Sequence, residues 1–221
     1  MTFLELKNLC ASYLDDLQFG YFTESQLGVW LNGAQQEVQK RLIKAGENYY
    51  TRCQITTLVV NQSRYALPED FKKLNRLEVI TTGVYPNESV LALTPMTINQ
   101  QDLIVRGTGQ PIFYYLDKNT IQLFPCPDTA LVMRMIYTYQ VTDMTLPTDT
   151  PDVPNTYHRM LALLAVEDGF LKDGRIPDLI VKKIKEYDDT MTTDSNERQQ
   201  DTVREIVATG DNFTGDGGIY W

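Results

Sequence analysis

The spacing of hydrophobic residues changes twice along this chain, and this limits the fold more than any other feature of the sequence. Apolar residues recur at helical spacing near the start, alternate from about Thr51 onward, and return to helical spacing after Pro154. A period near 3.6 indicates amphipathic helices, and a period of two indicates half-buried strands. The sequence therefore predicts an α+β fold, in which N- and C-terminal helices form an α-helical bundle around an inserted antiparallel, sandwich-like β domain.

Two helices are predicted at the N-terminal side. The first covers residues 2–17 and is expected to end at Gly20. The second begins after Thr23, because Thr23 and Gln26 have the spacing of a capping box. Gly46 is placed to end this second helix.

The middle of the chain is predicted to be rich in β-strands. Strands are expected at residues 55–60, 64–67, 76–80 and 131–139, with a hairpin over 112–124. In the loop of that hairpin, Asn119 is expected to adopt the left-handed conformation. Residues 81–110 have a mixed pattern that predicts no particular element.

Two further helices and a thin tail are predicted at the C-terminal side. One helix begins at Pro154 and ends before Gly174, and the next opens at Pro177. The final segment, residues 210–221, holds four of the 13 glycines together with aromatic side chains. Glycine favours mobility, whereas exposed aromatic rings are costly in water, so we expect a tail that orders on a partner. Its candidate partner-binding residues are Phe213, Ile219, Tyr220 and Trp221.

The predicted domain organisation follows these patterns. The N-terminal helices take residues 1–48, and the β-rich domain takes 49–145. The C-terminal helices that complete the helical domain take residues 146–195, and the extended C-terminal tail takes 196–221.

The sequence carries little catalytic or ligand-binding chemistry. The single histidine, His158, rules out a multi-histidine metal site, and no P-loop, dinucleotide-binding or serine-hydrolase motif is present. We therefore expect no enzyme, no cofactor and no metal. Two alternatives stay open: an unrecognised enzyme that uses Glu167, Asp168 and His158, and an aromatic-rich β binding module of a tail fibre or surface protein that uses Tyr114 or Tyr115.

Charge and hydropathy restrict the partners. The net charge is −9, and no cluster of Lys and Arg is free of acidic neighbours, which disfavours tight DNA binding but suits a surface past which DNA slides. The longest apolar run, Met160 to Val166, is far shorter than the roughly 18 residues that span a bilayer. No signal-peptide pattern follows Met1, so we expect neither secretion nor membrane insertion. The three cysteines form no CxxC pair, and each is expected to be a buried, reduced thiol.

Three local patterns, set between the two helix pairs, together resemble those of a known protein family. They are Arg64-Tyr65-Ala66-Leu67-Pro68-Glu69-Asp70-Phe71; Gly109-Gln110-Pro111-Ile112-Phe113-Tyr114 with Ile121-Gln122-Leu123-Phe124-Pro125-Cys126-Pro127-Asp128; and Leu146-Pro147 with Asp152-Val153-Pro154 and Tyr157-His158. In this order, over residues 3–190, the chain resembles the phage head–tail adaptor proteins. Relatives in that group include the podovirus tail tubular protein A group and the ring proteins of crAss-like phages.

The resemblance implies a structural virion protein of the phage neck, assembled in the host cytoplasm. Such proteins form a ring, usually of twelve copies, that binds the portal protein, extends the DNA channel and offers a platform for downstream tail or ring proteins. DNA would only pass through the lumen, without specific binding. Family members carry no enzymatic centre, and their C-terminal segments often reach the portal. Phe213, Ile219, Tyr220 and Trp221 are therefore the expected docking residues.

Overall fold

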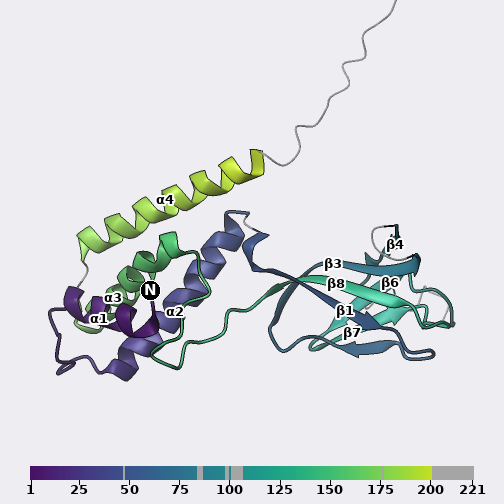
Figure 1. The fold of residues 1–221 in the computed structure, drawn as a ribbon, viewed down its shortest axis with the longest axis horizontal. Helices are drawn as coiled ribbons and strands as arrows, with labels where there is room; N and C mark the ends of the chain where they lie inside the picture. Colours follow the sequence, from purple (N-terminus) through teal and green to yellow (C-terminus); the bar gives the residue numbers. More distant parts are fainter. Residues whose placement is uncertain (47, 84–86, 98–99, 101–106, 176, 201–221) are drawn as a thin grey trace, which may run out of the picture.

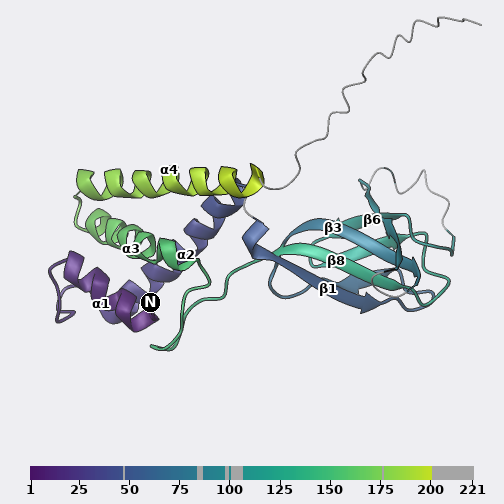
Figure 2. The same ribbon diagram turned by 45° about the horizontal axis from the view of Figure 1, so that its top comes forward.

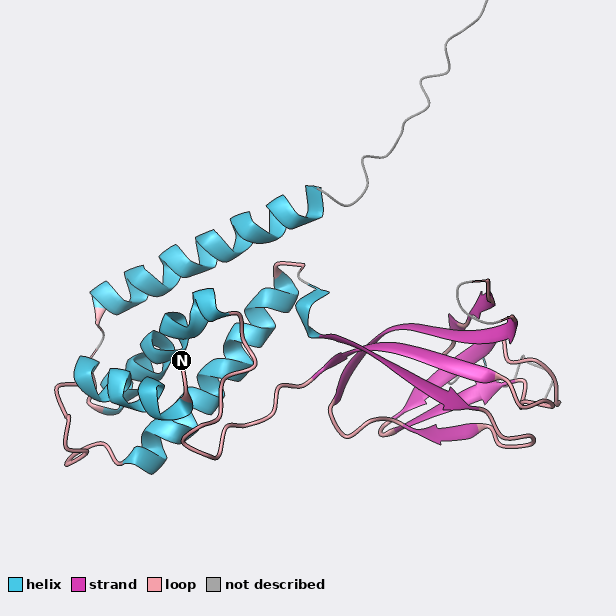
Figure 3. Ribbon diagram, viewed as in Figure 1, coloured by secondary structure: helices cyan, strands magenta, loops and turns pink. Residues whose placement is uncertain are grey.

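The computed structural model describes residues 1–46, 48–83, 87–97, 100, 107–175 and 177–200. Over this part of the chain the fold combines four α-helices with two β-sheets, which confirms the predicted α+β class. The helices lie together at one end of the molecule and the strands at the other (Figure 1). The chain passes from helices to strands and back again, as the colouring by secondary structure shows (Figure 3).

The first two helices begin at capping boxes. These helices are α1 (Phe3–Tyr13) and α2 (Glu24–Lys44). At the start of α2, the Thr23 hydroxyl accepts a hydrogen bond from the Gln26 amide at 3.3 Å, as the sequence predicts. Gly46 follows the end of α2 with φ of 92°, a left-handed conformation that favours glycine.

The helix α1 is shorter than predicted, and Gly20 does not end it. The backbone turns left-handed at Asp15, with φ of 54°. The carboxylate of Asp16 then accepts hydrogen bonds from the amides of Phe22 (2.8 Å) and Gly20 (2.9 Å), and these bonds lower its pKa. Leu17, predicted to lie on the helical stripe, therefore belongs to this loop and is 69% exposed.

The C-terminal helices begin and end near the predicted signals. They are α3 (His158–Lys172), which follows the short helix η3 (Asn155–Tyr157), and α4 (Asp178–Gln200). Gly174 ends α3 with φ of 70°, and the carbonyl of Pro177 accepts the amide of Val181 at the start of α4. Figure 2 shows α4 lying along α3. The last turns of α4 include residues 196–200 of the segment assigned to the tail.

The strands form two four-stranded sheets, which we call sheet A and sheet B. Sheet A has the order β1-β8-β3-β4 and is antiparallel throughout; sheet B has the order β2-β7-β6-β5, with β5 parallel to β6. A short helix, η1 (Asn48–Tyr50), leads into β1. The strands are β1 (Thr51–Thr57), β2 (Arg64–Ala66), β3 (Phe71–Thr82), β4 (Ser89–Ala92), β5 (Thr94–Pro95), β6 (Phe113–Asp117), β7 (Thr120–Phe124) and β8 (Val132–Tyr139).

Both sheets contribute to one hydrophobic core. From sheet A, Leu77 and Val79 on β3 are buried together with Met133 and Met135 on β8. From sheet B, Ile121 and Leu123 on β7 are buried in the same core cluster as these residues. The alternation that predicted the 131–139 strand is thus confirmed, because every second residue of β8 faces this core.

Three details of the strands differ from the sequence prediction. The strand predicted at 76–80 is part of the longer β3, whose register against β8 shifts at two bulges and so loses its regular alternation. The strand predicted at 55–60 ends at Thr57, since the Val59 amide bonds the Tyr65 hydroxyl at 2.9 Å. In the hairpin, the positive φ falls on Lys118, the first residue of the two-residue loop, and not on Asn119; positive φ at the first position alone is the pattern of a type II′ turn.

Candidate interaction surfaces

His158 has a structural position at the start of α3. Its side chain is buried, with Nε2 3.0 Å from the Val153 carbonyl oxygen and Nδ1 2.9 Å from the amino group of Met1. A carbonyl oxygen only accepts, so Nε2 carries the proton and Nδ1 accepts a hydrogen bond from the Met1 ammonium. Burial lowers the pKa of His158, and the nearby ammonium acts in the same direction. The imidazole therefore joins the N-terminus to α3.

The enzymatic alternative required Glu167, Asp168 and His158 to lie close together, and the structure keeps the two acidic residues apart from His158. Glu167 and Asp168 lie nine and ten residues after His158 on the same helix, which separates them from it by about 14 Å along the axis. Desolvation raises the pKa of Asp168, yet its side chain remains exposed. In the described part of the chain, no group of three or more His, Cys, Asp or Glu side chains is placed to hold a metal ion.

The aromatic alternative is also weakened by side-chain direction. Tyr114 and Tyr115 are neighbours on β6, so their rings point to opposite faces of sheet B and cannot form one platform. Tyr114 packs against the core, and its burial raises the pKa of the phenol.

The three cysteines are free, but their surroundings differ. Cys10 is buried, so the prediction of a buried thiol is confirmed there, and desolvation raises its pKa to about 12. Cys126 is half-buried. The prediction is wrong for Cys53, which is exposed because it lies on an edge strand of sheet A.

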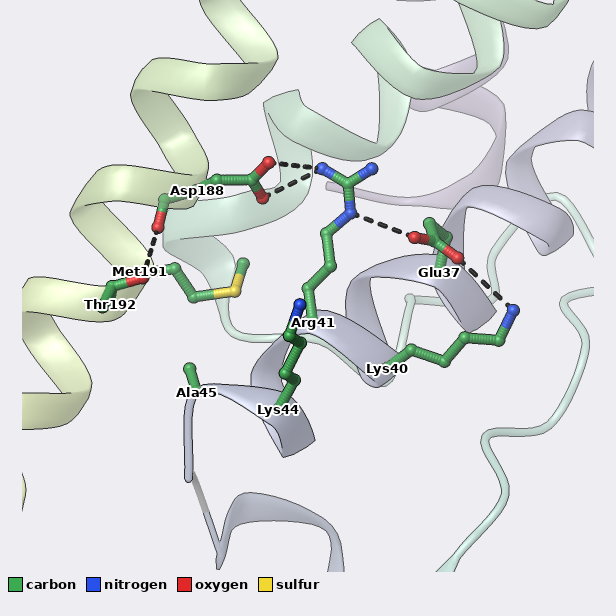
Figure 4. A pocket seen from close by; sticks show the side chains of 8 residues that line it. All are labelled: Glu37, Lys40, Arg41, Lys44, Ala45, Asp188, Met191 and Thr192. Atoms are coloured by element: carbon green, nitrogen blue, oxygen red, sulfur yellow. Dashed lines mark hydrogen bonds and ion pairs between the residues drawn. The ribbon is translucent and has the colours of Figure 1, made fainter.

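A groove between α2 and α4 contains the main polar contact between these helices (Figure 4). The guanidinium of Arg41 binds both carboxylate oxygens of Asp188, at 2.9 and 2.7 Å, and its Nε bonds Glu37 at 3.2 Å. The groove measures about 540 Å³ and is lined by Glu37, Lys40, Arg41, Lys44, Ala45, Asp188, Met191 and Thr192. This ion pair, in which one guanidinium nitrogen of Arg41 faces both oxygens of Asp188, ties the middle of α4 to the last turn of α2.

An ion cluster occupies the face of sheet A that points away from the core. Glu78 lies between Leu77 and Val79, so its side chain points to the opposite face, yet it is only 3% exposed. Its carboxylate binds Arg134 on the neighbouring strand at 2.7 Å and also pairs with Arg76. The hydrogen bonds from Arg134 to Glu78, and then to Glu88, raise the pKa of that guanidinium. We call this face, which also carries Ile55 and Ile136, the outer face of sheet A.

The strand β1 is the most exposed part of sheet A. It pairs with β8 along its full length and with no other described strand. Most of its side chains are exposed, and Ile55, on the outer face, is 64% exposed. The sequence analysis did not identify β1 or Glu78 as part of an interaction surface. The alternation of Cys53 and Ile55 with Arg52 and Gln54 was nevertheless a signal for an apolar strip along this strand.

The predicted docking residues lie outside the described residues. Phe213, Ile219, Tyr220 and Trp221 belong to residues 201–221, so their role stays a prediction. Among the described helices, none combines the length and the apolar character needed to cross a lipid bilayer.

The chain matches a protein-family model over most of its length. The model of the SU10 adaptor protein matches residues 1–209, which include all the described helices and strands. The match ends four residues before Phe213, so it does not reach the predicted docking residues. No curated protein matches the chain. Because the match extends through the helical part and both sheets, the chain belongs to the SU10 adaptor protein family.

Proposed function

We propose that this chain is the subunit of a head-to-tail adaptor ring in a phage neck. The observation that carries the proposal is the family match over residues 1–209, which supports a structural phage adaptor protein. The ring has twelve copies, binds the portal above and receives the next tail or ring protein below. Assembly takes place in the host cytoplasm, and relatives of the chain include the podovirus tail tubular protein A group and the crAss-like ring proteins.

The subunit consists of two units, one helical and one built of β-strands. Residues 1–48 and 146–195 form a helical unit from both ends of the chain, and residues 49–145 form a β unit inserted between them. Support comes from the buried pairing of α1, α2 and α3, which join residues far apart in the sequence. The Arg41–Asp188 pair holds α4, and thereby the start of the segment 196–221, against this unit.

The charge of the chain agrees with a channel that DNA passes through. A net charge of −9 gives phosphates little to bind. The DNA contact is therefore transient and non-specific, and the lasting partners are proteins.

The tail provides the link to the portal. Phe213, Ile219, Tyr220 and Trp221 are large apolar or aromatic side chains among the glycines of residues 210–221. Aromatic anchors of this kind dominate the binding energy of many protein interfaces. We place these four residues in a groove of the portal or of a neighbouring subunit.

Ring formation is tested by imaging the full chain with and without the portal protein of the same phage. We expect cyclic particles in negative stain, and a matching mass by light scattering, at least when the portal is present. Monomers alone in both conditions would contradict the proposed function.

The role of the tail needs a control that preserves its length. One variant lacks residues 210–221, and a second keeps that length but carries F213S, I219S, Y220S and W221S. We expect both variants to fold, since the family match ends at residue 209, and both to lose portal attachment. Attachment by the serine variant at wild-type strength would show that these four side chains are not the docking residues.

A further inference from the structure

We propose that sheet A continues from one subunit to the next: the edge strand β1 of one copy pairs with the edge strand β4 of its neighbour. This inference rests on the proposed ring. The two strands stand at opposite edges of the same four-stranded sheet, β1-β8-β3-β4. An interface that joins two different edges is heterologous, and heterologous contacts generate closed rings when the rotation closes.

The free edge of β1 lacks the usual protection against pairing. It is seven residues long, whereas the other edge strands, β4, β2 and β5, have four, three and two residues. Its pairing with β8 is regular, without bulge or proline. Its single charged residue, Arg52, is engaged by Asp70 and lies 3.8 Å from the centre of the Tyr139 ring. Proteins usually blunt exposed edges with short strands, bulges or free charges, so the unblunted edge of β1 indicates a pairing site, whereas β4 is short and its pairing with β3 contains a register shift.

The hydrogen-bond pattern shows which backbone groups of β1 point outward. The Leu58 amide donates to the Leu131 carbonyl at 2.7 Å, directly after the aligned pair Thr57 and Val132. Hydrogen-bonded and non-bonded pairs alternate along an antiparallel ladder. The amides and carbonyls of Cys53 and Ile55 therefore point away from β8, toward the open edge.

The same reasoning applies to β4. The Leu93 amide donates to the Leu77 carbonyl at 2.9 Å, directly after the aligned pair Ala92 and Glu78. The backbone groups of Val90 and Ala92 therefore point away from β3. Each edge thus offers two adjacent sets of donors and acceptors with no partner among the described residues.

The side-chain faces of the two edges also agree. Ile55 is aligned with Arg134, and Arg134 with Glu78, which in turn is aligned with Ala92. Residues aligned across a sheet point to the same face, so Ile55 and Ala92 both lie on the outer face of sheet A. Cys53 and Val90, two residues away from these on the same strands, share that face. If the residues with outward-pointing backbone groups had their side chains on opposite faces in β1 and in β4, the pleats of the two strands could not match across the interface.

Strand direction permits the join. The four strands of sheet A alternate strictly in direction, so β1 and β4 run opposite ways. A rotation about an axis roughly parallel to the strands brings β4 of one copy beside β1 of the next in antiparallel orientation. We assign Cys53 opposite Ala92 and Ile55 opposite Val90, because this register sets the exposed Ile55 against another β-branched apolar side chain.

The dimensions of such a ring suit a channel. Four strands at about 4.8 Å give each copy about 19 Å of circumference. Twelve copies would close at about 230 Å, a diameter of about 70 Å before strand tilt is included. That is wide enough for a DNA duplex with protein lining the lumen.

Cysteine cross-linking tests the register directly. In a Cys126→Ser background, Ala92→Cys places a thiol opposite the native Cys53, at a separation of about 5.5 Å between Cα atoms, within the disulfide range. We expect mild oxidation of portal-bound rings to give a ladder of covalent oligomers on non-reducing gels. Cys10 should not contribute, since it is buried and its pKa is about 12.

Two controls define the result. Adding Cys53→Ser to the same protein must remove the ladder, and Leu91→Cys, whose side chain faces the opposite side of the sheet, must give none. A ladder that persists without Cys53, or a ring with Ala92→Cys that gives no ladder, would overturn the pairing while leaving the ring function in place.

An assembly measurement provides a second, independent readout. Ile55→Lys adds an edge-protecting charge, and we expect at least a tenfold loss of ring assembly by light scattering, with an unchanged circular dichroism spectrum. Ile112→Lys, at another exposed isoleucine outside sheet A, should assemble normally. Assembly of Ile55→Lys at the wild-type level would count against the pairing, whereas absence of rings in the wild-type chain with portal would overturn both the pairing and the proposed function.

Discussion

The helix α3 and the strand β1 show opposite uses of apolar side chains. In α3, all residues from Met160 to Val166 are buried, because α1, α2 and α4 surround this helix. In β1, most side chains are exposed and Ile55 is 64% exposed, because β8 is its one strand neighbour among the described residues. The packing around α3 is thus complete within the subunit, whereas sheet A leaves an edge that a second copy can complete.

The largest expected effect contrasts these two regions directly. We expect Leu161→Ala to reduce the free energy of unfolding by about 3 kcal/mol, since it opens a cavity in a fully buried site. Ile55→Ala should change the stability of the isolated subunit by less than about 0.5 kcal/mol. Urea unfolding of both variants measures the difference. Equal losses of unfolding free energy in the two variants would mean that β1 belongs to the subunit's own core, and the contrast between α3 and β1 would not hold.

The ion cluster on the outer face of sheet A should have the next largest effect. Glu78→Ala leaves Arg134 and Arg76 without their shared carboxylate. Because both guanidiniums retain some contact with water, we expect a loss of about 2 kcal/mol, below the roughly 3–5 kcal/mol of a fully buried pair. Glu69→Ala, at an exposed position in the same part of the chain, is the control and should be near neutral. A neutral Glu78→Ala would show that the cluster does not stabilise the sheet.

A smaller effect is expected where α4 meets α2. Asp188→Asn weakens the ion pair with Arg41, and both side chains are partly exposed, so the cost should be about 0.5–1 kcal/mol. The loss should appear as faster amide hydrogen exchange in α4, with little change in α3. Asp189→Asn, its exposed neighbour, should leave exchange unchanged. Equal acceleration in α3 would mean that the two helices open together.

The smallest expected effect is a pH dependence from His158. Its pKa in the folded state lies below the ordinary value of 6.5, because burial disfavours the charged ring. The unfolded chain therefore binds the proton first, so stability should fall as pH decreases from 6.5 toward the folded pKa, with no contribution from this residue well above 6.5. Melting temperatures of the wild type and His158→Gln across this range test it. A wild-type pH slope no steeper than that of the variant would contradict this role for His158.

Much of the fold could be predicted from local patterns. The capping box at Thr23 and the glycine at 46 act within a few residues of the chain, and the structure has the helix where these signals place it. The alternation of apolar residues along β8 likewise predicts a strand with one buried face, and the structure has this strand. Prediction failed where a distant or competing contact decides the local conformation. Asp16 caps a loop that replaces the last turn of the first helix, and two bulges hide the alternation of β3.

The sequence by itself determined the succession of helices, strands and helices, because hydrophobic period and capping are local properties of the chain. It also pointed to the adaptor family through motifs that the family match over residues 1–209 supports at the level of a phage adaptor. Only the tertiary structure decided that Glu78 is buried among arginines and that β1 and β4 end one sheet with matching faces. Sheet order and cross-strand pairing join residues far apart in the chain, and no local pattern encodes which strand is left at an edge.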